Sequence, residues 1–555
     1  MKYPFYTIEP VQHTRGLFER CLKHYADRII FKEYTLDRTL IALSYKHFLN
    51  QVEALGTALL NNTGVGKHFG ILGDNSIGWV QAYLSVITGL GVAVPLDKEM
   101  TEDILEQLIK KGDCDYLFVS NRFFPMAQRI FERVDRLERL IVIDPQYEVD
   151  YGEHWLLSQL IEFGRQLRFF GDRSYTELPI DHNALCEILF TSGTTGANKG
   201  VMLSQKNLAT VINGAVSVIS PPGETISLLP ISHAYECSCH ILGGMYLGAT
   251  ICFNDSLKNV SRNFALFQPN FTLVVPMILE SFHRQIWKSI QNNHLTKHVQ
   301  YGLAVSNLIR RFGIDQRRLY FKPIHQSFGG NFHRIVCGGA PLAPDLAQNL
   351  IDLGIEVVNG YGITECGPLV SCSRFDWKKK VGSVGRPIPD CNVRISQEGE
   401  IQVKGGNVML GYYGDPAATK DSFTDDGWLR TGDIGRLDKD GFLYVDGRLK
   451  NLIILPNGKN VHPEMIEGLL SKKLSYVKES IVYANGDHLI KAACYLDPEF
   501  SQAHGEKSLD ILRQDVRRFN QLMPAYMQIG DIELVETEFI KTTTRKIKRH
   551  LYKGV

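Results

Sequence analysis

Most of this chain alternates between short apolar runs and stretches in which apolar residues recur with helical spacing. The apolar runs are typical of strands, and they include HFGILG, DYLFVS, RLIVID, TLVVP and RIVCGG. Stretches such as AYLSVITGL and APDLAQNLIDLG are typical of helices. Strands that alternate with helices form parallel sheets covered by helices, so the sequence predicts an α/β fold.

The pattern changes from about Gly382, where short strands and turns replace the alternation. NVRISQEGEIQVKG and GRLDKDGFLYVDGRLKNLIIL predict antiparallel strands, with Asp440 and Gly441 closing a hairpin. The C-terminal part mixes strands with two helices, PEMIEGLLSKK and SLDILRQDVRRFNQLM. A chain of 555 residues exceeds the usual size of one domain. We therefore predict a large N-terminal domain of layered α/β subdomains with a β-rich subdomain, followed by a small α+β domain.

Charge and cysteine content disfavour several classes of protein. The chain has 61 Lys and Arg residues against 60 Asp and Glu residues, which gives no general reason to bind nucleic acid. Eleven cysteines without paired spacing favour reduced thiols in the cytoplasm. The first residues lack the apolar core of a signal peptide. Polar residues and glycines interrupt the uncharged stretch Trp79–Leu96, so we expect a buried helix and a strand there rather than a membrane span.

The stretch TSGTTGANKG, Thr191 to Gly200, directly follows the apolar run CEILF. Its glycines let backbone N–H groups turn inward, and its hydroxyls and Lys199 add donors, which together suit a phosphate. The nucleotide P-loop has four residues between its first glycine and its Gly-Lys pair, whereas here only Ala197 and Asn198 separate Gly196 from Lys199. The stretch predicts a phosphate-binding loop of another kind, and a plain flexible connector is the alternative.

Three further stretches combine small residues with one or two polar groups. VCGGAPL is typical of a strand that ends in glycines, against which a flat ring could lie. In NGYGITECG, Thr364 could donate to a phosphate, and Glu365 could bind a hard cation such as Mg²⁺. In WLRTGDIG, Asp433 could accept from both hydroxyls of a ribose. The alternatives are a surface acid at a helix start for Glu365 and a turn aspartate for Asp433.

The stretch HAYECSCH has residue types that bind metals, namely His233, Cys237, Cys239 and His240. A zinc site of the usual kind needs a second pair of Cys or His residues with matching spacing. No such pair accompanies this stretch in the sequence, which disfavours a metal site.

Taken in order, these stretches resemble the adenylate-forming superfamily of acyl-CoA synthetases, peptide-synthetase adenylation domains and luciferases. The resemblance spans nearly the whole chain and is carried by TSGTTGANKG, GGAPL, YGITE, TGD, GRLKNLI, NGKNVHPEMIE and TTTRKIKR. LLPISHAYE, AVPLDKE, NVMLGYY and LKNLIILPNGKNVHPEMIE look most like AMP-binding acyl-CoA synthetases of the bacterial long-chain fatty acid–CoA ligase type. Members commonly have glycine before the C-terminal lysine, whereas this chain has Arg545 before Lys546.

The resemblance implies an AMP-forming long-chain fatty acid–CoA ligase. Such an enzyme uses ATP and Mg²⁺ to convert a medium- or long-chain fatty acid to acyl-AMP with release of pyrophosphate, then transfers the acyl group to coenzyme A. An acyl-AMP ligase that loads an acyl carrier protein stays open as the alternative. A non-catalytic nucleotide-binding relative is disfavoured because Thr364, Glu365, Asp433, Arg448 and Lys546 are all present. The exact acid, the pathway and the oligomeric state stay open.

The resemblance also implies a role for each matched residue. Lys546 would contact the substrate carboxylate and the α-phosphate, and Thr364 would touch the α-phosphate. Glu365 would hold Mg²⁺, and Asp433 and Arg448 would fix the ribose. The other residues implied in ATP binding are Thr191, Ser192, Gly193, Thr194, Thr195, Gly196, Lys199, Gly338, Gly339, Ala340, Gly360, Tyr361 and Gly362.

In this family the C-terminal domain turns about a hinge between the two half-reactions. Lys450 occupies the hinge position, which implies an N-terminal AMP-binding and acyl-binding domain over residues 1–449 and a mobile C-terminal domain over residues 450–555. Gly458 lies in the loop that would line the tunnel for coenzyme A. The alternatives are a solvated strand residue for Lys450 and an ordinary turn residue for Gly458.

Two residues bear on the acyl pocket. His233 resembles the catalytic-pocket histidine that shifts between the half-reactions, and a hydrogen-bonded core histidine is the alternative. Acetate-selective relatives carry tryptophan where this chain has Gly362, which predicts space for a long acyl chain.

The net charge of the whole chain is close to zero, but one segment carries an excess of positive charge. Residues 281–330 carry eight Lys and Arg residues, and Asp315 is their only acid. Several aromatic residues share the segment. A helical segment with this mixture could rest on an anionic bilayer, its basic residues near the headgroups and its aromatic residues in the interface. We therefore expect a cytoplasmic protein with peripheral contact with the inner face of the membrane, and a solvated helical hairpin is the alternative.

Overall fold

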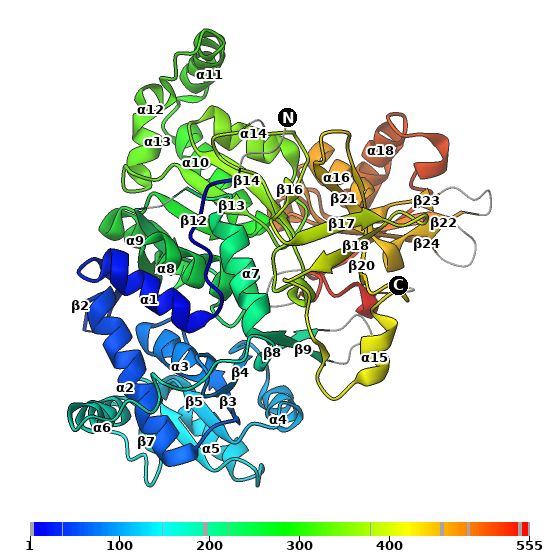
Figure 1. The fold of residues 1–555 in the computed structure, drawn as a ribbon. Helices are drawn as coiled ribbons and strands as arrows, with labels where there is room; N and C mark the ends of the chain where they lie inside the picture. The colour runs from blue at the N-terminus through cyan, green and yellow to red at the C-terminus, as the bar shows by residue number, and fades with distance from the viewer. Residues whose placement is uncertain are drawn as a thin grey trace. The chain divides into compact units, whose positions relative to one another are not determined.

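The computed structural model describes residues 5–35, 37–146, 148–192, 198–220, 223–377, 379–455, 460–484, 489–541 and 547–552. The chain forms two compact units, which Figure 1 draws as one ribbon. Unit 1 comprises Met1–Gly193, Asn198–Asn392 and Val403–Leu429. Unit 2 includes Val393–Gln402 and Arg430–Val555. Both units contain helices and sheets, which confirms the predicted mixed α/β class with a large N-terminal and a smaller C-terminal part.

Unit 1 contains an eight-stranded sheet in which a parallel core continues into an antiparallel hairpin. Apolar runs buried on both faces are typical of such parallel strands. In spatial order the strands are β19 (Gly411–Tyr412), β9 (Asn198–Ser204), β8 (Leu185–Ser192), β4 (Gly91–Leu96), β3 (Lys67–Leu72), β5 (Tyr116–Val119), β6 (Arg139–Val142) and β7 (Trp155–Leu156). Strands β8, β4, β3, β5, β6 and β7 are paired in parallel, whereas β9 runs antiparallel to β8 and to β19.

A second sheet of unit 1 has nine strands. In spatial order they are β16 (Arg386–Pro387), β15 (Ser371–Cys372), β14 (Glu356–Tyr361), β13 (Arg334–Cys337), β12 (Phe271–Val274), β10 (Glu224–Ser227), β11 (Thr250–Phe253), β1 (Ile29–Tyr34) and β2 (Leu40–Ser44). From β14 to β1 each pair is parallel. The carboxyl ends of these strands therefore meet at one edge, where parallel α/β sheets place their ligand sites.

Helices cover both sheets. Around the eight-stranded sheet they are α2 (Tyr45–Thr63), α3 (Ile77–Ile87), α4 (Glu102–Lys111), α5 (Phe124–Phe131) and α6 (Leu157–Phe169). The remaining helices of unit 1 are α1 (Thr14–Tyr25), α7 (Gln205–Val216), α8 (Gly243–Leu247), α9 (Val260–Phe267), α10 (Pro276–Asn292), α11 (Thr296–Arg310), α12 (Arg317–Tyr320), α13 (Lys322–Ser327), α14 (Pro344–Asp352) and α15 (Pro416–Asp421).

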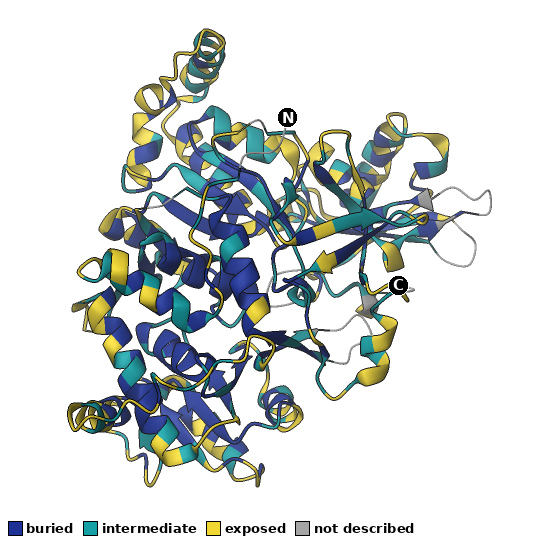
Figure 2. Cartoon of the chain, viewed as in Figure 1, coloured by how far each residue is buried: buried dark blue, intermediate teal, exposed yellow. Residues whose placement is uncertain are grey.

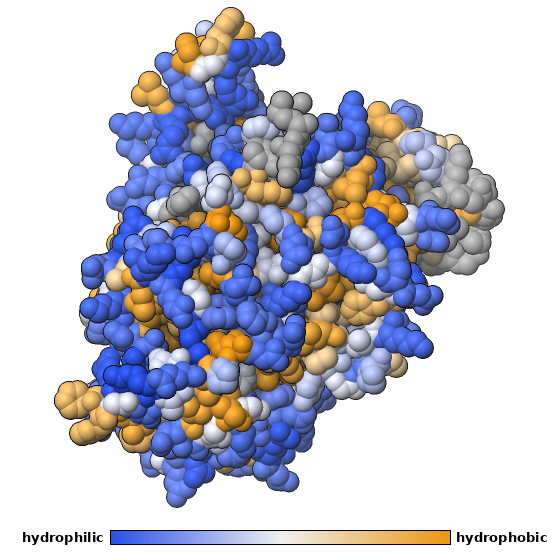
Figure 3. Space-filling model, in the orientation of Figure 1, coloured by the Kyte–Doolittle hydropathy of each residue, from blue (hydrophilic) through white to orange (hydrophobic). Residues whose placement is uncertain are grey.

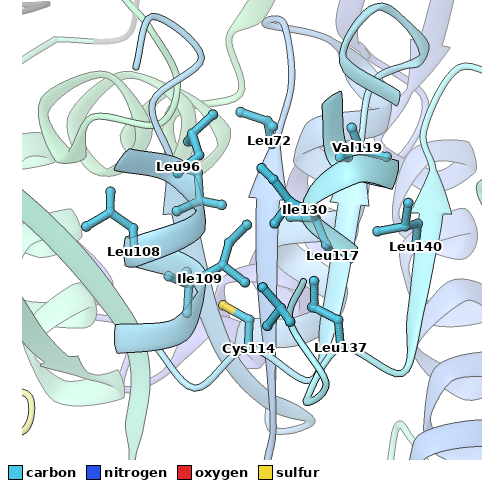
Figure 4. Packing of buried hydrophobic residues seen from close by; sticks show 14 of the residues in the cluster. Leu72, Leu96, Leu108, Ile109, Cys114, Leu117, Val119, Ile130, Leu137 and Leu140 are labelled. Atoms are coloured by element: carbon cyan, nitrogen blue, oxygen red, sulfur yellow. The ribbon is translucent and has the colours of Figure 1, made fainter. Parts of the chain in front are cut away.

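A buried apolar cluster fixes α4 and α5 on the eight-stranded sheet. Leu108 and Ile109 of α4, Ile130 of α5 and Leu117 of β5 belong to this cluster, part of which Figure 4 shows. Figure 2 shows the strands of this region as buried and the outer helix faces as exposed. Removing such side chains from water is the main favourable term of folding, at about 25 cal/mol per Å² of apolar surface.

The uncharged stretch Trp79–Leu96 is a buried helix followed by a strand, as the sequence predicts. Helix α3 begins after Ser76, whose side chain accepts a hydrogen bond from the Trp79 backbone N–H and so caps the helix. Its turn into β4 passes through Gly89, which has a φ of 94° that favours glycine. Among the described residues, no helix is long and apolar enough to cross a membrane.

Unit 2 includes most of a four-stranded sheet in which β20 and β21 are antiparallel. Its strands, in order, are β17 (Cys391–Ile395), β18 (Glu400–Gly405), β20 (Leu429–Leu437) and β21 (Leu443–Arg448). The predicted turn at Asp440 and Gly441 joins β20 to β21, and the Gly441 N–H donates to the Asp438 carbonyl. The predicted β-rich region is therefore present.

The rest of unit 2 combines a three-stranded sheet with helices around one core. The strands are β22 (Ile453–Ile454), β23 (Asn460–Val461), β24 (Val477–Ala484), β25 (Ile490–Leu496) and β26 (Asp531–Leu534), of which the last three form that sheet. The helices are α16 (Pro463–Lys473), α17 (Pro498–His504) and α18 (Ser508–Asn520). Leu470, Cys494 and Leu512 are among the buried residues of the core. The C-terminal part thus has the α+β composition that the sequence predicts.

All eleven cysteines are free thiols. Cys239 is half-buried and the other ten are buried. Burial raises the pKa of thiols such as Cys21 and Cys372 to about 12, so these side chains stay protonated at neutral pH. The prediction that the cysteines form no disulfide framework is confirmed.

Candidate active site

The predicted site residues of unit 1 follow the carboxyl ends of parallel strands. Gly338, Gly339 and Ala340 follow β13, and His233 lies in the connection after β10. Gly360 and Tyr361 end β14, and the short 3-10 helix Thr364–Cys366 comes next. Because β10, β13 and β14 belong to the parallel part of one sheet, these groups share one sheet edge.

The described ends of the stretch TSGTTGANKG belong to two antiparallel strands, β8 and β9. Thr191 of β8 pairs with Lys199 of β9, and Ser192 pairs with Asn198. The Thr191 hydroxyl also lies 3.5 Å from the Lys199 carbonyl oxygen, to which it can donate. The pairing of β8 with β9 therefore fixes both ends of the predicted phosphate loop. A P-loop would instead lead from a strand into a helix, so the prediction that this stretch is not one is confirmed.

Tyr412 connects the hairpin to Glu365. The Lys199 ammonium nitrogen lies 4.6 Å from the centroid of the Tyr412 ring, within cation–π range. The Tyr412 hydroxyl donates to Glu365 Oε1 at 2.9 Å, and the backbone of Glu365 accepts from the Met409 N–H at 2.9 Å. Strand β19, which carries Tyr412, pairs with β9 through Val201. Lys199 and Glu365, two predicted site residues distant in sequence, are thereby joined through Tyr412, which lies in the stretch NVMLGYY but has no predicted role there.

Tyr412 itself is held neutral. Burial raises the pKa of its hydroxyl well above the usual value, and the Glu365 carboxylate raises it further. The hydroxyl therefore keeps its proton at physiological pH and acts as a donor to Glu365. One carboxylate oxygen of Glu365 is oriented by this bond.

Close backbone contact explains the glycine at position 362. A Cβ built on Gly362 would lie 1.7 Å from the Pro368 carbonyl oxygen, far inside van der Waals contact. The space beside the Gly362 Cα is therefore filled by the chain's own backbone. The sequence predicts room for a long acyl chain at this position, and the structure gives that prediction no support.

The glycines after β13 lie beside an aromatic ring. A Cβ on Gly338 would lie 3.1 Å from the Tyr235 hydroxyl, which itself donates to the Val336 carbonyl at 3.2 Å. Gly339 has a φ of 78°, a conformation that other residues rarely adopt, and is exposed. Gly338 is buried, so Gly339 is the glycine whose backbone is exposed, and the predicted contact with a planar ligand stays a prediction. Tyr235 is a further residue of this region that the motifs did not identify.

His233 faces a buried acid from the other sheet. Its Nε2 lies 3.5 Å from Oδ2 of Asp97, which comes directly after β4. Asp97 is buried, and its Oδ2 accepts no hydrogen bond within the described part of the chain. His233 is about 30% exposed, so it is not the fully buried core histidine of the alternative interpretation. The contact links the carboxyl edges of the two sheets.

Asn75 holds the connection that leads to His233. Its side-chain amide donates to the Leu229 carbonyl at 2.7 Å and to the Ser227 hydroxyl at 3.2 Å, and its Oδ1 accepts from the Ile231 N–H at 3.0 Å. Asn75 follows β3 in the stretch LGDNS, where a polar residue after a buried strand was the only signal in the sequence. Three hydrogen bonds from one side chain fix the backbone just before His233.

Most of the stretch HAYECSCH belongs to a π-helix, Tyr235–Leu242, which begins two residues after His233. A π-helix is a rare element that often occurs at functional sites. His240 lies 2.7 Å from Glu236 through Nδ1 and 2.9 Å from the Thr225 hydroxyl through Nε2, and all three residues are buried. Both ring nitrogens of His240 are thus engaged with the chain itself. In the described residues, no group of three or more His, Cys, Asp or Glu side chains could hold a metal ion.

In unit 2, the predicted ribose-binding pair is formed. Asp433 and Arg448 are directly opposite each other in the β20–β21 ladder, and Arg448 Nε donates to Asp433 Oδ1 at 2.8 Å. Asp433 is 5% exposed, so its carboxylate is buried in β20 and its orientation is fixed by Arg448. Lys450 lies in the 3-10 helix Leu449–Asn451 directly after β21 and is exposed.

Several predicted residues lie outside the described part of the chain. They are Gly193, Thr194, Thr195 and Gly196 of the hairpin end, Gly458 of the implied coenzyme A tunnel, and Lys546. Their roles stay predictions.

The donor set of Glu365 fits a magnesium ion that is shared with a nucleotide. Mg²⁺ usually takes one or two carboxylates together with phosphate oxygens and water, rather than a cage of protein ligands. A single carboxylate whose orientation is fixed by Tyr412 satisfies this requirement. Thr364, its neighbour in the same 3-10 helix, supplies a hydroxyl donor beside it.

The sequence matches the models of two family domains. Residues 18–413 match the AMP-binding enzyme model, and residues 450–553 match the AMP-binding enzyme C-terminal domain. The long-chain-fatty-acid–CoA ligase FadD15 of Mycobacterium tuberculosis is 31% identical over 331 residues, which cover 56% of this chain and 54% of the relative. Long-chain-fatty-acid–CoA ligase 6 of Mus musculus is 27% identical over 507 residues, which cover 84% of this chain and 71% of the mouse protein. The match thus spans about half of the mycobacterial relative.

Solved structures with the same fold include two that cover nearly the whole chain. The anthranilate CoA ligase AuaEII in complex with anthranoyl-AMP superposes with a TM-score of 0.76 at 20% identity, over 100% of this chain and 97% of that chain. The adenylation domain of a carboxylate reductase from Mycobacterium chelonae superposes with a TM-score of 0.75 at 21% identity, over 98% of this chain and 90% of that domain. At this level of identity the likeness shows the fold.

Proposed function

The chain belongs to the AMP-binding enzyme family, and on that basis we propose that it is an AMP-forming long-chain fatty acid–CoA ligase. The observation that carries the proposal is the connection from Lys199 through Tyr412 to Glu365, which joins a candidate phosphate-binding cation to a candidate metal ligand. The names of the relatives from M. tuberculosis and mouse support the substrate class.

The first half-reaction joins a fatty carboxylate to the α-phosphate of ATP, with pyrophosphate leaving. Both partners are anions, so their approach requires positive charge and hydrogen-bond donors around the reacting atoms. Lys199 and the hydroxyls of Thr191 and Ser192 would receive the departing pyrophosphate at the hairpin end. Thr364 would donate to the α-phosphate, and Lys546 would contact both anions. The protein supplies no covalent nucleophile in this scheme.

Glu365 would hold Mg²⁺ together with phosphate oxygens, and the ion when bound would offset negative charge on the phosphates. The bond from Tyr412 keeps the Glu365 carboxylate oriented before any nucleotide binds. Gly338 and Gly339 would lie against adenine, and Asp433 with Arg448 would fix the ribose. Ala340, Gly360 and Tyr361 complete the proposed nucleotide site.

In the second half-reaction the thiol of coenzyme A attacks the acyl carbon, and AMP leaves. We assign the hinge between these steps to Lys450, the boundary between the domains to residues 449 and 450, and the lining of the coenzyme A tunnel to Gly458. His233 would move aside to admit the thiol, and its contact with Asp97 would hold it in one of its two positions.

The acceptor and the cellular location are part of the proposal. We propose coenzyme A as the acceptor and a cytoplasmic location, where free thiols persist. An acyl carrier protein is the second candidate acceptor, because the adenylation step would be the same.

The deciding experiment measures the two half-reactions separately. ATP–pyrophosphate exchange with a series of fatty acids reports adenylation, and supply of either coenzyme A or an acyl carrier protein then reports transfer. Exchange that depends on medium- or long-chain acids, followed by acyl-CoA formation, supports the proposal. Exchange without acyl-CoA formation, but with loading of the carrier protein, would favour the second candidate. Absence of exchange with every fatty acid would refute both.

Two variants test the assigned roles. Lys546→Ala should lower acyl-AMP formation about 10²- to 10³-fold, as for the loss of one strong charge-stabilising donor, and should spare transfer from preformed acyl-AMP. Lys450→Pro should spare acyl-AMP formation and lower the transfer of the acyl group to coenzyme A, because a fixed φ at the hinge would block rotation of the C-terminal domain. Equal loss of both half-reactions in either variant would contradict its assignment.

A further inference from the structure

Unit 1 exposes a group of large apolar side chains on and after α11. Figure 1 shows α11 and α12 standing away from the strands of unit 1. Tyr301 is 75% exposed, Phe312 is 78% exposed and Leu319 is 70% exposed. We call this group the α11 face, and its members are Tyr301, Leu308, Phe312, Ile314, Leu319 and Tyr320. Figure 3 shows apolar side chains among hydrophilic ones at this end of the unit.

The exposed large apolar residues of α11 and of the turn that follows it lie on one side of the helix. Tyr301, Leu308 and Phe312 follow one another at intervals of seven and four residues, which at 3.6 residues per turn brings them into line. Arg311 continues the helical backbone at the C-cap, so Phe312 lies one turn beyond Leu308. Lys297, four residues before Tyr301, falls on the same side.

The basic residues on and after α11 divide into three groups, of which the third is Arg318, whose guanidinium donates to the backbone carbonyls of Gly330 and Phe332. Arg310 forms an ion pair with Asp352 at 3.4 Å, and Arg317 forms ion pairs with Asp315 and Glu356. These contacts fix the helices within unit 1. The second group consists of Lys297, Arg311 and Lys322, which are exposed and form no ion pair in the part of the chain that the structure describes.

We propose that the α11 face docks on an anionic lipid bilayer. The exposed apolar side chains would enter the interface, and Lys297, Arg311 and Lys322 would lie near the phosphate headgroups. The charge of this segment favours an anionic lipid surface as the partner, because Asp315, the only acid of residues 281–330, is already paired with Arg317. The unpaired charge around the apolar side chains is therefore positive alone, which complements an anionic surface.

This inference goes beyond the proposed ligase activity and does not depend on it. No residue of the α11 face belongs to the proposed nucleotide site, and the test needs neither ATP nor a fatty acid. If the activity is also confirmed, docking would let the enzyme take an apolar substrate from the bilayer.

The test measures co-sedimentation of the full chain with vesicles of phosphatidylcholine alone and of phosphatidylcholine with phosphatidylglycerol. The native chain should bind the anionic vesicles at low salt and lose most of that binding at high salt. Lys297→Gln with Arg311→Gln should weaken binding about 30-fold, at about 1 kcal/mol for each charge removed. Leu308→Ser with Phe312→Ser should weaken binding at both salt concentrations.

The matched control is Lys46→Gln with Lys206→Gln, which removes two exposed lysines of unit 1 outside this segment. The control should bind as the native chain does. Thermal unfolding of every variant checks that the fold is retained, and the salt titration of the native chain needs no variant. Negligible binding of the native chain to anionic vesicles, or equal losses in the control and the charge variant, would overturn the proposal. Capture by a protein partner without vesicle binding would also overturn it.

Discussion

The hydroxyl of Tyr412 lies 2.9 Å from Oε1 of Glu365, a residue 47 positions earlier in the chain. The same Tyr412 ring lies beneath the ammonium group of Lys199. Tyr412 is therefore a positioning residue that touches two groups of the proposed site, one through its hydroxyl and one through its ring. Substitution can separate these two contacts.

Tyr412→Phe keeps the ring beside Lys199 and removes the hydroxyl that donates to Glu365. A hydrogen bond to a charged group contributes about 1.5–3 kcal/mol, so acyl-AMP formation should fall about 10- to 100-fold at limiting Mg²⁺. High Mg²⁺ should restore part of the loss, because the carboxylate remains. Pyrophosphate exchange measured across a Mg²⁺ titration checks this.

Tyr413→Phe is the matched control for that variant, since Tyr413 donates to Asp113 instead. The control should show the native dependence on Mg²⁺. If the two variants lose activity alike, or if Mg²⁺ does not change the loss in Tyr412→Phe, the positioning role is wrong.

Gly362→Ala tests the two explanations of this glycine against each other. The added Cβ would meet the Pro368 carbonyl oxygen at 1.7 Å, so the backbone must move. We expect a lower melting temperature and a loss of adenylation that is similar for acids of every chain length. A selective loss for long acids, with unchanged melting, would instead favour a pocket that opens at Gly362. Melting curves and exchange rates with short and long acids give the answer.

Glu187 predicts a pH dependence of stability. Its side chain is fully buried in β8, and burial raises the pKa of the carboxyl from 4.5 to about 8. Between these values the folded chain holds more protons than the unfolded chain, so the free energy of unfolding falls as pH rises. The slope is at most about 1.4 kcal/mol per pH unit.

Glu187→Gln removes this titration and should flatten the decline in stability between about pH 5 and pH 8. Urea unfolding at a series of pH values measures the slope. Exposed Glu177→Gln is the control and should keep the native slope. An unchanged slope in Glu187→Gln would show that another group is responsible.

Asn75→Ala should destabilise unit 1. The change removes three hydrogen bonds to the connection before His233, and a net contribution of about 1 kcal/mol each predicts a loss of about 2–3 kcal/mol. Asn75→Asp retains the acceptor for the Ile231 N–H but places an oxygen against the Leu229 carbonyl, so it should not restore the native stability. Urea unfolding compares the two variants, and equal stability of Asn75→Ala and the native chain would contradict the bracing role.

Local patterns in the sequence predicted most elements of the fold. The stretch PEMIEGLLSKK coincides with α16, and GVAVPL coincides with β4. Helix α18 ends at Asn520, short of the predicted Met523, because the final residues turn toward β26. Periodicity and capping act within a few residues, so a single sequence contains enough information to predict such elements.

The site could be predicted only where its residues lie within one motif. Thr364 and Glu365 are adjacent, and the Asp433–Arg448 pair lies in a hairpin whose turn is evident. Asp97 and Tyr412 lie in AVPLDKE and NVMLGYY, two stretches that carry the resemblance, and Asn75 follows β3. All three act on residues far away in the chain, and nothing local identifies those partners. Such contacts arise when sheets assemble, which spacing in the sequence does not encode.

The burial of the native thiols makes the chain a ready substrate for site-directed labelling. A cysteine introduced at position 312 would be the most exposed thiol, because ten native cysteines are buried and Cys239 is half-buried. Thiolates rather than thiols react with maleimides, and burial keeps the native side chains protonated. A single environment-sensitive dye could therefore be attached to the introduced cysteine without first substituting the eleven native cysteines.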